Sequence, residues 1–442
     1  MSVTLHRIAP ENVHETLRRS ILADGFEIVL DLDKSQGVRL YDAKSRRFFL
    51  DMFSCFASAP LGFNHPRLVE PEFVARLGRI AVGKPSNSDL YTVELAEFVD
   101  TFARLAAPST LPHLFFVEGG TLGVENALKT AMDWKVRLNL AAGRGERGHQ
   151  VLHFRDCFHG RSGYTLSLTN TAPVKTLYFT KFDWPRITNP KLRFPVTPAE
   201  EERVAAAEAG AVREIEAAFA AHPHDICAII LEPIQGEGGD NHFRPEFFRA
   251  LRRLADEHEA FLIFDEVQAG MGITGRMWAH EHFGVQPDAI SFGKKTQVCG
   301  TAVGRRVEAV EDNVFRVPSR LNSTWGGNLV DMVRCQRILE VMHEEHLVQN
   351  AARLGEGLLA GLQQVVGRHG DWIDNARGRG LMCAFDVRDS QTRKRLLGGC
   401  AERGLMLVGC GERTVRFRPA LTVTAPELQE ALELLDQAVT AL

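Results

Sequence analysis

No long hydrophobic run occurs anywhere in the 442 residues. A bilayer-spanning helix needs roughly 20 consecutive apolar residues, and no apolar stretch of this chain comes close to that length. Residues 1–20 also lack the apolar segment of a secretory signal. A charge excess is missing as well, because 52 Lys and Arg face 56 Asp and Glu for a formal net charge of −4. The sequence therefore predicts no membrane span and no nucleic acid or anionic surface as partner.

Paired cysteines and metal-ligand spacings are also missing. Eight cysteines are scattered without a C-x-x-C pair, and the 16 histidines form neither H-E-x-x-H nor a Cys/His ligand pattern. Scattered cysteines in a long chain without a signal peptide are typical of reduced, mostly buried thiols in a cytoplasmic protein. We therefore expect a cytoplasmic location and no bound metal.

What the sequence does contain, from about residue 90 onward, is an alternation of helical and strand patterns. The expected helices cover 92–106, 121–139, 198–221 and 245–259, and the expected strands cover 113–120, 150–156, 225–239, 260–267, 288–295 and 301–306. Near-continuous apolar runs in the strands indicate a sheet that is buried on both faces. We predict an α/β fold, with a mostly parallel central sheet, helices on both of its faces and a smaller α+β domain.

The two ends of the chain have a different pattern. A helix at 11–22 and strand-like pieces at 26–33 and 38–52 are expected before a helix that begins near residue 71. After residue 328 we expect helices at 328–343, 347–366 and 426–442, and short strands at 381–387, 405–410 and 414–421. This pattern predicts a large α/β domain at 71–328 and a small discontinuous domain formed by 1–70 and 329–442.

Two glycine patterns imitate nucleotide-binding motifs. Gly270, Gly272 and Gly275 match G-x-G-x-x-G after a strand, but no helical pattern begins among them. The segment from Gly293 to Thr296 resembles the end of a P-loop, but Asp288 stands where that motif requires its first glycine. Neither pattern predicts a nucleotide site.

Two apolar strands end abruptly in charged residues. The strand at 261–264 is followed by Asp265, and the strand at 289–292 is followed by Gly293, Lys294 and Lys295. Ligands of parallel sheets lie beyond the carboxyl ends of the strands, and a carboxylate in such a place needs a partner. The simple interpretation is an ion pair between Asp265 and Lys294. The alternative is that both face pyridoxal 5'-phosphate (PLP), where a lysine forms an imine and a carboxylate holds the ring nitrogen protonated.

Three further features bear on this choice. Lys295 competes with Lys294, but alternation along a strand lets only one of them point into a site. Gly119, Gly120 and Thr121 stand between a strand and a helix, which gives either an anion site or a helix capped by Thr121. Phe158 follows another strand and could either stack on a flat ring or belong to the core.

Several segments resemble the class III, fold-type I, PLP-dependent aminotransferases. They are EGGTLGVENALK, CFHGRSGYTLSLTN, ILEPIQGEGGD, LIFDEVQAGMGITG, PDAISFGKK and NSTWGGN, in the order of that family and over roughly residues 30–440. KFDWPRI, FGKKTQVCG, RGRGLMCAF and TVRFRPALTV are similar to the branch that transfers the ε-amino group of L-lysine. One departure is Ile273, which stands where the wider family has an arginine.

The resemblance implies roles for residues around the cofactor. Lys294 matches the Schiff-base lysine, Asp265 the partner of the pyridine nitrogen and Gln268 the neighbour of the ring hydroxyl. Gly120 and Thr121 match the phosphate-binding turn, and Phe158 and Val267 match the residues that cover the two ring faces. Thr324 matches a threonine that reaches the phosphate from a second subunit, which implies a homodimer with shared active sites.

The resemblance also implies residues that bind substrate. Arg416 matches the arginine for the α-carboxylate of glutamate or the keto acid, and Glu237 the acid that masks it while the ε-amino donor is bound. Arg161 resembles the arginine that holds the distal carboxylate, and Asn322 lies in a segment that shapes the pocket. Glu237 paired with Arg416 would let one site bind lysine and glutamate in different orientations.

The activity implied by the resemblance is transfer of the ε-amino group of L-lysine to 2-oxoglutarate by a ping-pong mechanism. The products would be L-glutamate and 2-aminoadipate 6-semialdehyde, which cyclises to piperideine-6-carboxylate. The sequence leaves open ornithine, 4-aminobutyrate or another terminal amine as donor, with the deciding residues near 52–61 and 322–324. A catalytically silent relative that only binds PLP or a partner is disfavoured, because Lys294, Asp265 and Gly120 are all present.

Overall fold

The structure is a computed structural model that describes residues 7–442. A seven-stranded mixed sheet forms the centre of the protein. The strand order is β3-β9-β8-β7-β6-β4-β5. All neighbouring pairs from β8 to β5 are parallel, whereas β9 is antiparallel to both β3 and β8. The strands are β3 (His113–Val117), β4 (Gln150–Phe154), β5 (Arg186–Ile187), β6 (Ile226–Leu231), β7 (Phe261–Asp265), β8 (Ala289–Phe292) and β9 (Cys299–Val303).

Helices cover both faces of this sheet, which explains why its central strands carry almost no polar residue. Along β7, Phe261 and Ile263 pack in the same cluster as Val124 and Ala127 of α5 (Gly120–Ala141), whereas Leu262 and Phe264 pack in the cluster of α8 (Pro245–Glu257). Alternation along a strand sends successive side chains to opposite faces, so both sets must be apolar. The remaining helices of this layer are α4 (Val93–Leu105), α6 (Gly163–Leu168) and α7 (Pro198–Ala221), the last being the helix expected at 198–221.

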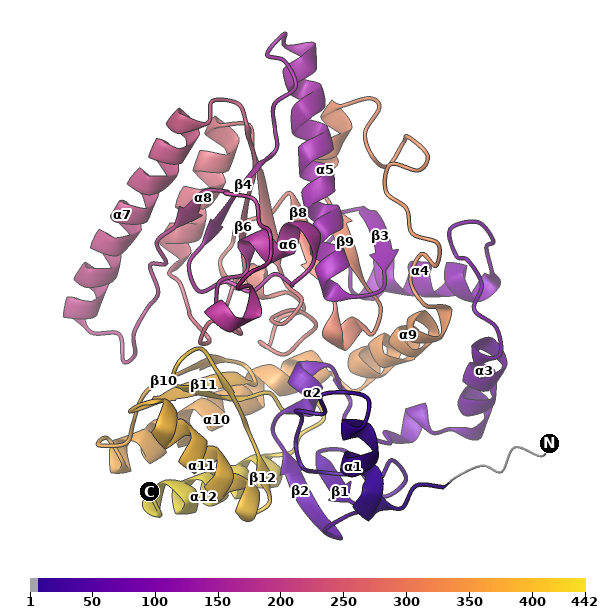
Figure 1. Cartoon of the computed structure of the whole chain (residues 1–442), viewed down its shortest axis with the longest axis vertical. Coiled ribbons are helices and arrows are strands. Elements are labelled where there is room, and N and C mark those ends of the chain that lie inside the picture. The colour runs from indigo at the N-terminus through magenta and orange to yellow at the C-terminus, as the bar shows by residue number, and fades with distance from the viewer. Residues whose placement is uncertain (1–6) are drawn as a thin grey trace.

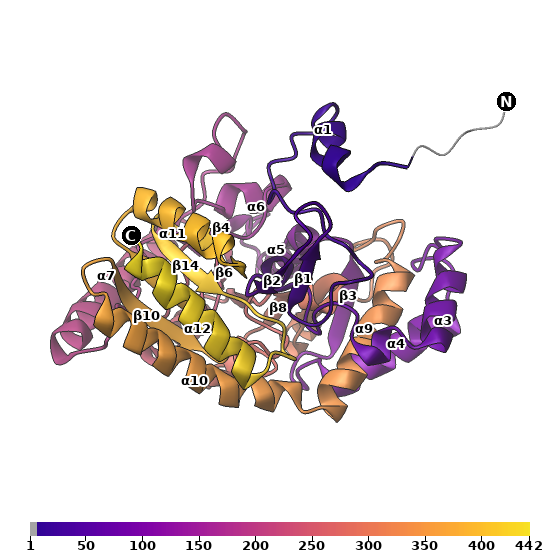
Figure 2. The ribbon, with the colours of Figure 1, turned by 90° about the horizontal axis from the view of Figure 1, so that it is seen from below.

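Two smaller sheets lie below the central one in Figure 1. One joins β1 (Arg39–Asp42) and β2 (Arg47–Asp51) to β12 (Leu405–Met406), so that segments from opposite ends of the sequence pair side by side (Figures 1 and 2). The other has the order β10-β11-β14-β13. Its strands are β10 (Ile373–Arg379), β11 (Met382–Val387), β13 (Val408–Cys410) and β14 (Thr414–Phe417).

The other helices connect these layers or lie on the smaller sheets. Near the start of the chain are α1 (Val13–Arg18), α2 (Ser54–Ala57) and α3 (Pro71–Ala81). Toward the end are α9 (Leu329–Glu344), α10 (Leu347–Arg368), α11 (Ser390–Glu402) and α12 (Ala425–Thr440). No helix within residues 7–442 has the length and apolarity to cross a membrane. The division into domains at 70/71 and 328/329 stays a prediction. The placement of the three sheets is compatible with it.

Some expected elements were wrong. The segment 26–33 is not a strand, because Asp31 accepts hydrogen bonds from the amides of Asp33 and Lys34 and turns the chain there. The helix expected at 11–22 is a short 3₁₀ turn followed by α1, which ends at Arg18. The sequence predicted that residues 1–20 contain no secretory signal, and residues 1–6 of that segment lie outside the described residues.

Two elements near the end of the chain were not predicted. Helix α11 contains Gly398 and Gly399 and few apolar residues, although Asp389 caps it by accepting a hydrogen bond from the amide of Thr392 at 2.7 Å. Strand β10 is mostly polar and is held by pairing with β11 rather than by its own pattern.

Candidate active site

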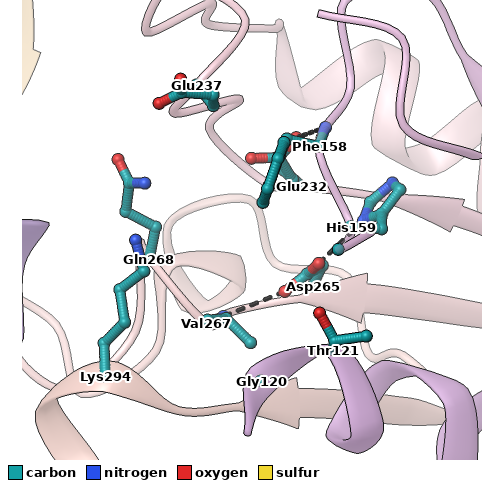
Figure 3. Close-up of a pocket in the computed structure, with 11 residues that line it drawn as sticks. Gly120, Thr121, Phe158, His159, Glu232, Glu237, Asp265, Val267, Gln268 and Lys294 are labelled. Atoms are coloured by element: carbon teal, nitrogen blue, oxygen red, sulfur yellow. Dashed lines mark hydrogen bonds and ion pairs between the residues drawn. The ribbon is translucent and has the colours of Figure 1, made fainter. Parts of the chain in front are cut away.

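A cavity of about 220 Å³ lies beyond the carboxyl ends of β6, β7 and β8 and beside the first turn of α5. Figure 3 shows its lining side chains converging from these elements. The position agrees with the rule that ligands of parallel sheets bind outside the carboxyl ends of the strands. The lining residues are Gly120, Thr121, Phe158, His159, Gly160, Glu232, Glu237, Asp265, Val267, Gln268 and Lys294.

Asp265 is the last residue of β7 and is buried. Its Oδ1 accepts hydrogen bonds from the Val267 amide and the Ser291 hydroxyl, both at 3.1 Å, and its Oδ2 accepts one from His159 Nδ1 at 2.7 Å. Burial lowers the pKa of His159, but the neighbouring Cys157 and the Asp265 carboxylate both raise it, and the resulting pKa lies well above the usual value. Both carboxylate oxygens are therefore held in fixed directions, and a histidine cation stabilises the charge of Asp265.

Lys294 and Lys295 have different surroundings. The strand ends at Phe292, and the two lysines lie in a 3₁₀ turn (Lys294–Thr296), with Lys294 in the left-handed region at φ +54°. Lys294 lines the cavity, whereas Lys295 is buried and its Nζ donates to the backbone carbonyl of Gln268 at 2.7 Å. The side chains of the two lysines point in different directions, as expected. The reason is the geometry of this turn and not the alternation of side chains along a strand.

The surroundings of Lys294 lower the pKa of its amine. Burial, followed by the positive charges of Arg416 and Arg418, lowers its pKa from 10.5 to about 8. No ion pair joins Lys294 to Asp265 among the described residues, so the simple salt-bridge interpretation of this pair does not hold. Near neutral pH an appreciable fraction of the Lys294 amine is neutral and nucleophilic.

The first turn of α5 forms the floor of the cavity. Its N-cap residue is Gly119, at φ +98°, and no side chain caps the helix, so Thr121 does not have the capping role considered above. A Cβ at Gly120 would lie 3.1 Å from Cγ1 of Val267, a tight contact that would require the Val267 side chain to shift. Uncapped amides at the positive end of a 22-residue helix suit an anionic group such as a phosphate.

Glu232 connects two loops of the site. Its Oε1 accepts a hydrogen bond from the Phe158 amide at 2.9 Å, and its Oε2 accepts one from the Gly236 amide at 3.0 Å. Burial raises the pKa of Glu232 to about 7, with His159 opposing and Asp265 adding to the increase. No role was predicted for Glu232 or His159 from the sequence, although both follow strands at the edge of the sheet where ligands are expected.

Glu237 and Arg416 form an ion pair at the mouth of the cavity. Arg416, on β14, donates from Nη2 to Glu237 Oε2 at 2.8 Å and from Nη1 to Gln268 Oε1 at 3.2 Å. Burial raises the pKa of Glu237, but Arg416 and Lys175 outweigh it and bring the pKa below its ordinary value. Lys175, whose Nζ donates to Glu237 Oε1 at 2.7 Å, had no signal in the sequence.

The glycines beside Glu237 are required by close packing rather than by mobility. A Cβ at Gly236 would lie 2.3 Å from Gln268 Oε1, and one at Gly238 would lie 1.8 Å from the carbonyl oxygen of Asp156. The first contact is with the movable end of a side chain, but the second is with backbone, so Gly238 leaves no room for a side chain and the loop packs closely there. The mobile-loop interpretation of Glu237 is therefore not supported.

Four predicted site residues do not line the cavity: Arg416, which contacts two of the lining residues, and Arg161, Asn322 and Thr324. Arg161, Asn322 and Thr324 are all exposed. Arg161 directly follows Gly160 of the lining, whereas Asn322 and Thr324 belong to a loop whose backbone is bonded to Ser86 and Ser88. The structure of one chain therefore brings eight of the twelve predicted residues into the cavity wall and adds Arg416 through its contacts with Glu237 and Gln268.

These features fit PLP. The cavity offers an amine of lowered pKa, a carboxylate held by hydrogen bonds, an aromatic ring and a helix terminus suited to phosphate. The family model "Aminotransferase class-III" matches residues 22–439. The chain belongs to the class III aminotransferases, which are PLP-dependent transaminases of fold type I, and the predicted fold class, enzyme class and cofactor are confirmed.

Several relatives that match most of this chain are named L-lysine-epsilon aminotransferases, and the human mitochondrial 4-aminobutyrate aminotransferase is 31% identical over 423 residues, which cover 90% of this chain and 82% of the relative. The L-lysine-epsilon aminotransferase of Mycobacterium tuberculosis is 55% identical over 425 residues, which cover 96% of this chain and 94% of the relative. That of Streptomyces clavuligerus is 51% identical over 435 residues, which cover 98% and 94%. The solved structure of the lysine aminotransferase from M. tuberculosis in the internal aldimine form superposes with a TM-score of 0.96 at 54% identity, covering 98% of this chain and all of that one.

Proposed function

We propose that this enzyme transfers the ε-amino group of L-lysine to 2-oxoglutarate in a ping-pong reaction. The products are L-glutamate and 2-aminoadipate 6-semialdehyde, which cyclises to piperideine-6-carboxylate. The names of the more similar relatives above support lysine as donor. The observation that carries the proposal is the ion pair between Glu237 and Arg416, because it provides a site that can bind substrates in two orientations.

The residues of the cavity have distinct tasks in this proposal. When bound, PLP supplies a ring that accepts electrons as a C–H bond of the substrate breaks. Asp265, oriented by His159, holds the proton on the ring nitrogen. The amides of Gly120 and Thr121 would hold the phosphate, Phe158 and Val267 would cover the ring, and Gln268 would contact the ring hydroxyl, since all of these residues line the cavity.

Lys294 binds the cofactor and moves protons. Its pKa of about 8 lets the released amine accept a proton from the substrate carbon and return it near neutral pH.

The ion pair of Glu237 with Arg416 acts as a gate. Lysine presents its ε-amine, and the carbons next to that amine carry no carboxylate that Arg416 could bind. In that half-reaction the charge of Arg416 is therefore neutralised by Glu237. Glutamate presents its α-amine one carbon away from a carboxylate, which requires Glu237 to leave and Arg416 to bind the carboxylate. Arg161 binds the distal carboxylate in both half-reactions.

A panel of amino donors tests this function. With 2-oxoglutarate as acceptor, we expect lysine to give the cyclic imine and glutamate at a kcat/KM at least about tenfold above that for ornithine or 4-aminobutyrate. The imine is detected by its condensation with 2-aminobenzaldehyde, and glutamate by chromatography. Turnover of ornithine or 4-aminobutyrate but not of lysine would replace lysine with that donor and leave the transaminase class intact.

We propose further that the enzyme is a homodimer with shared active sites. Thr324 is exposed in the single chain and does not line its cavity, so it can reach a phosphate only in a second subunit, and Asn322 would enter the substrate pocket from the same loop. Light scattering should give twice the mass of the chain, and Thr324→Ala should weaken PLP binding about tenfold without changing that mass. A monomer with full PLP affinity would contradict this proposal. We also propose a cytoplasmic location, which cell fractionation tests.

A further inference from the structure

Glu237 stands between two cavities. On one side is the active-site cavity, and on the other is a second cavity of about 340 Å³ that also has Glu237 in its wall. This second cavity carries two basic side chains, Lys175 and Arg393. The proposed reaction uses neither of them, although one is in direct contact with the gate.

The carboxylate of Glu237 bridges two cations, one on each side. Its Oε2 accepts from Arg416 at 2.8 Å, and its Oε1 accepts from Lys175 Nζ at 2.7 Å. Lys175 is itself oriented, because its Nζ also contacts Thr171 Oγ1 at 3.2 Å and lies 5.2 Å from the centre of the Phe158 ring. The side chain of Lys175 is 23% exposed, so this pair is shielded from most of the solvent.

The backbone of the gate residue packs closely on its neighbours, so we take opening to be a rotation of the Glu237 side chain. A Cβ at Gly238 would lie 1.8 Å from the carbonyl oxygen of Asp156, so the chain next to Glu237 lies against neighbouring backbone. The carbonyl oxygen of Glu237 also accepts a hydrogen bond from the Gly411 amide at 2.9 Å, and Gly411 belongs to the wall of the second cavity. Rotation of Glu237 away from Arg416 therefore moves its carboxylate toward the second cavity.

That cavity has a positive charge in excess. Arg393, on α11, donates from Nη1 to the carbonyl oxygens of Cys410 and Gly411, both at 2.9 Å, and no carboxylate among residues 7–442 lies within ion-pair distance of it. A carboxylate that enters this space would keep Lys175 as partner and gain attraction from Arg393.

We propose that Lys175 is a positioning residue that holds Glu237 in its open position, within the second cavity. The inference rests on the proposed function, because it assumes that the gate opens for one substrate and closes for the other. Without Lys175, the closed gate would still have Arg416 as its partner, whereas the open gate would lose its principal cation. Lys175 therefore favours the binding of substrates whose α-carboxylate takes the place of Glu237 on Arg416.

Two unreactive ligands separate the two binding modes. Glutarate has the two carboxylates of 2-oxoglutarate and needs an open gate, whereas hexanoate has one carboxylate for Arg161 and an apolar chain that leaves the gate closed. Calorimetry on the holoenzyme should show that Lys175→Met raises the Kd of glutarate about five- to tenfold and that of hexanoate by less than about twofold. The KM values of 2-oxoglutarate and lysine should follow the same pattern.

Two matched variants control this experiment. Lys175→Arg keeps the charge and should restore glutarate binding to within about threefold of the original protein. Lys181→Met removes a lysine from the same segment, whose Nζ donates only to the Thr176 carbonyl oxygen, and should leave both ligands unaffected. Equal weakening of both ligands, no change in glutarate binding, or selective weakening of hexanoate would overturn the inference. Absence of lysine turnover in the original protein would instead overturn the proposed function.

Discussion

Replacing Lys294 with alanine is expected to abolish the visible absorbance of the PLP-bound protein and to lower transamination at least about 10³-fold. Within residues 7–442, no other amine lines the cavity, so none of the lining residues can take the place of Lys294 as the group that binds the cofactor and moves the proton. A spectrum between 300 and 500 nm and the lysine assay measure the two effects independently.

Lys295→Met is the matched control for this variant. The Lys295 amine donates to the Gln268 carbonyl oxygen in the interior, away from the cavity, and burial brings its pKa well below the ordinary value. We expect Lys295→Met to keep the visible band and to unfold at a somewhat lower temperature, because a buried carbonyl loses its partner. A band that survives in Lys294→Ala and disappears in Lys295→Met would reverse the assignment of the two lysines.

The second large effect is expected for Asp265→Asn, which should lower kcat about 10²–10³-fold while the cofactor stays bound. The substitution keeps the size of the side chain and removes the negative charge that faces the site from the end of β7. Without that charge, neither the proton on the ring nitrogen nor the cation of His159 is stabilised.

Ser291→Ala controls for disturbance of the same carboxylate. It removes one neutral hydrogen bond to Asp265 Oδ1 and leaves the charge and the His159 contact in place, so kcat should fall only about two- to tenfold. If Asp265→Asn reduced kcat no more than Ser291→Ala does, the charge of Asp265 would have no role in catalysis.

The sequence predicted the central sheet well because its signals are local. Strands such as β6, β7 and β8 are continuous apolar runs that end at charged or glycine residues, and buried parallel strands have this pattern wherever they occur. The same strand ends indicated the positions of Asp265 and Lys294. The polar strand β10 and the glycine-containing helix α11 gave no such signal, because pairing with β11 and capping by Asp389 stabilise them.

Contacts between distant segments could not be predicted. Lys175 approaches Glu237 from a position 62 residues earlier, and His159 approaches Asp265 from 106 residues earlier. Nothing in the pattern around Lys175 distinguishes it from an exposed lysine on a surface turn. The close packing of Gly236 and Gly238 likewise depends on Gln268 and Asp156, so the sequence could not separate a rigid loop from a mobile one.

The measurement that tests the central claim most directly is the transfer of labelled nitrogen from lysine to glutamate. The gate formed by Glu237 and Arg416, together with Lys294 and Asp265, predicts that the enzyme removes the terminal amine and not the α-amine. With 2-oxoglutarate as acceptor, [6-¹⁵N]lysine should give labelled glutamate, and [2-¹⁵N]lysine should give unlabelled glutamate and a labelled cyclic imine. Label in glutamate from [2-¹⁵N]lysine, or from neither substrate, would contradict the account.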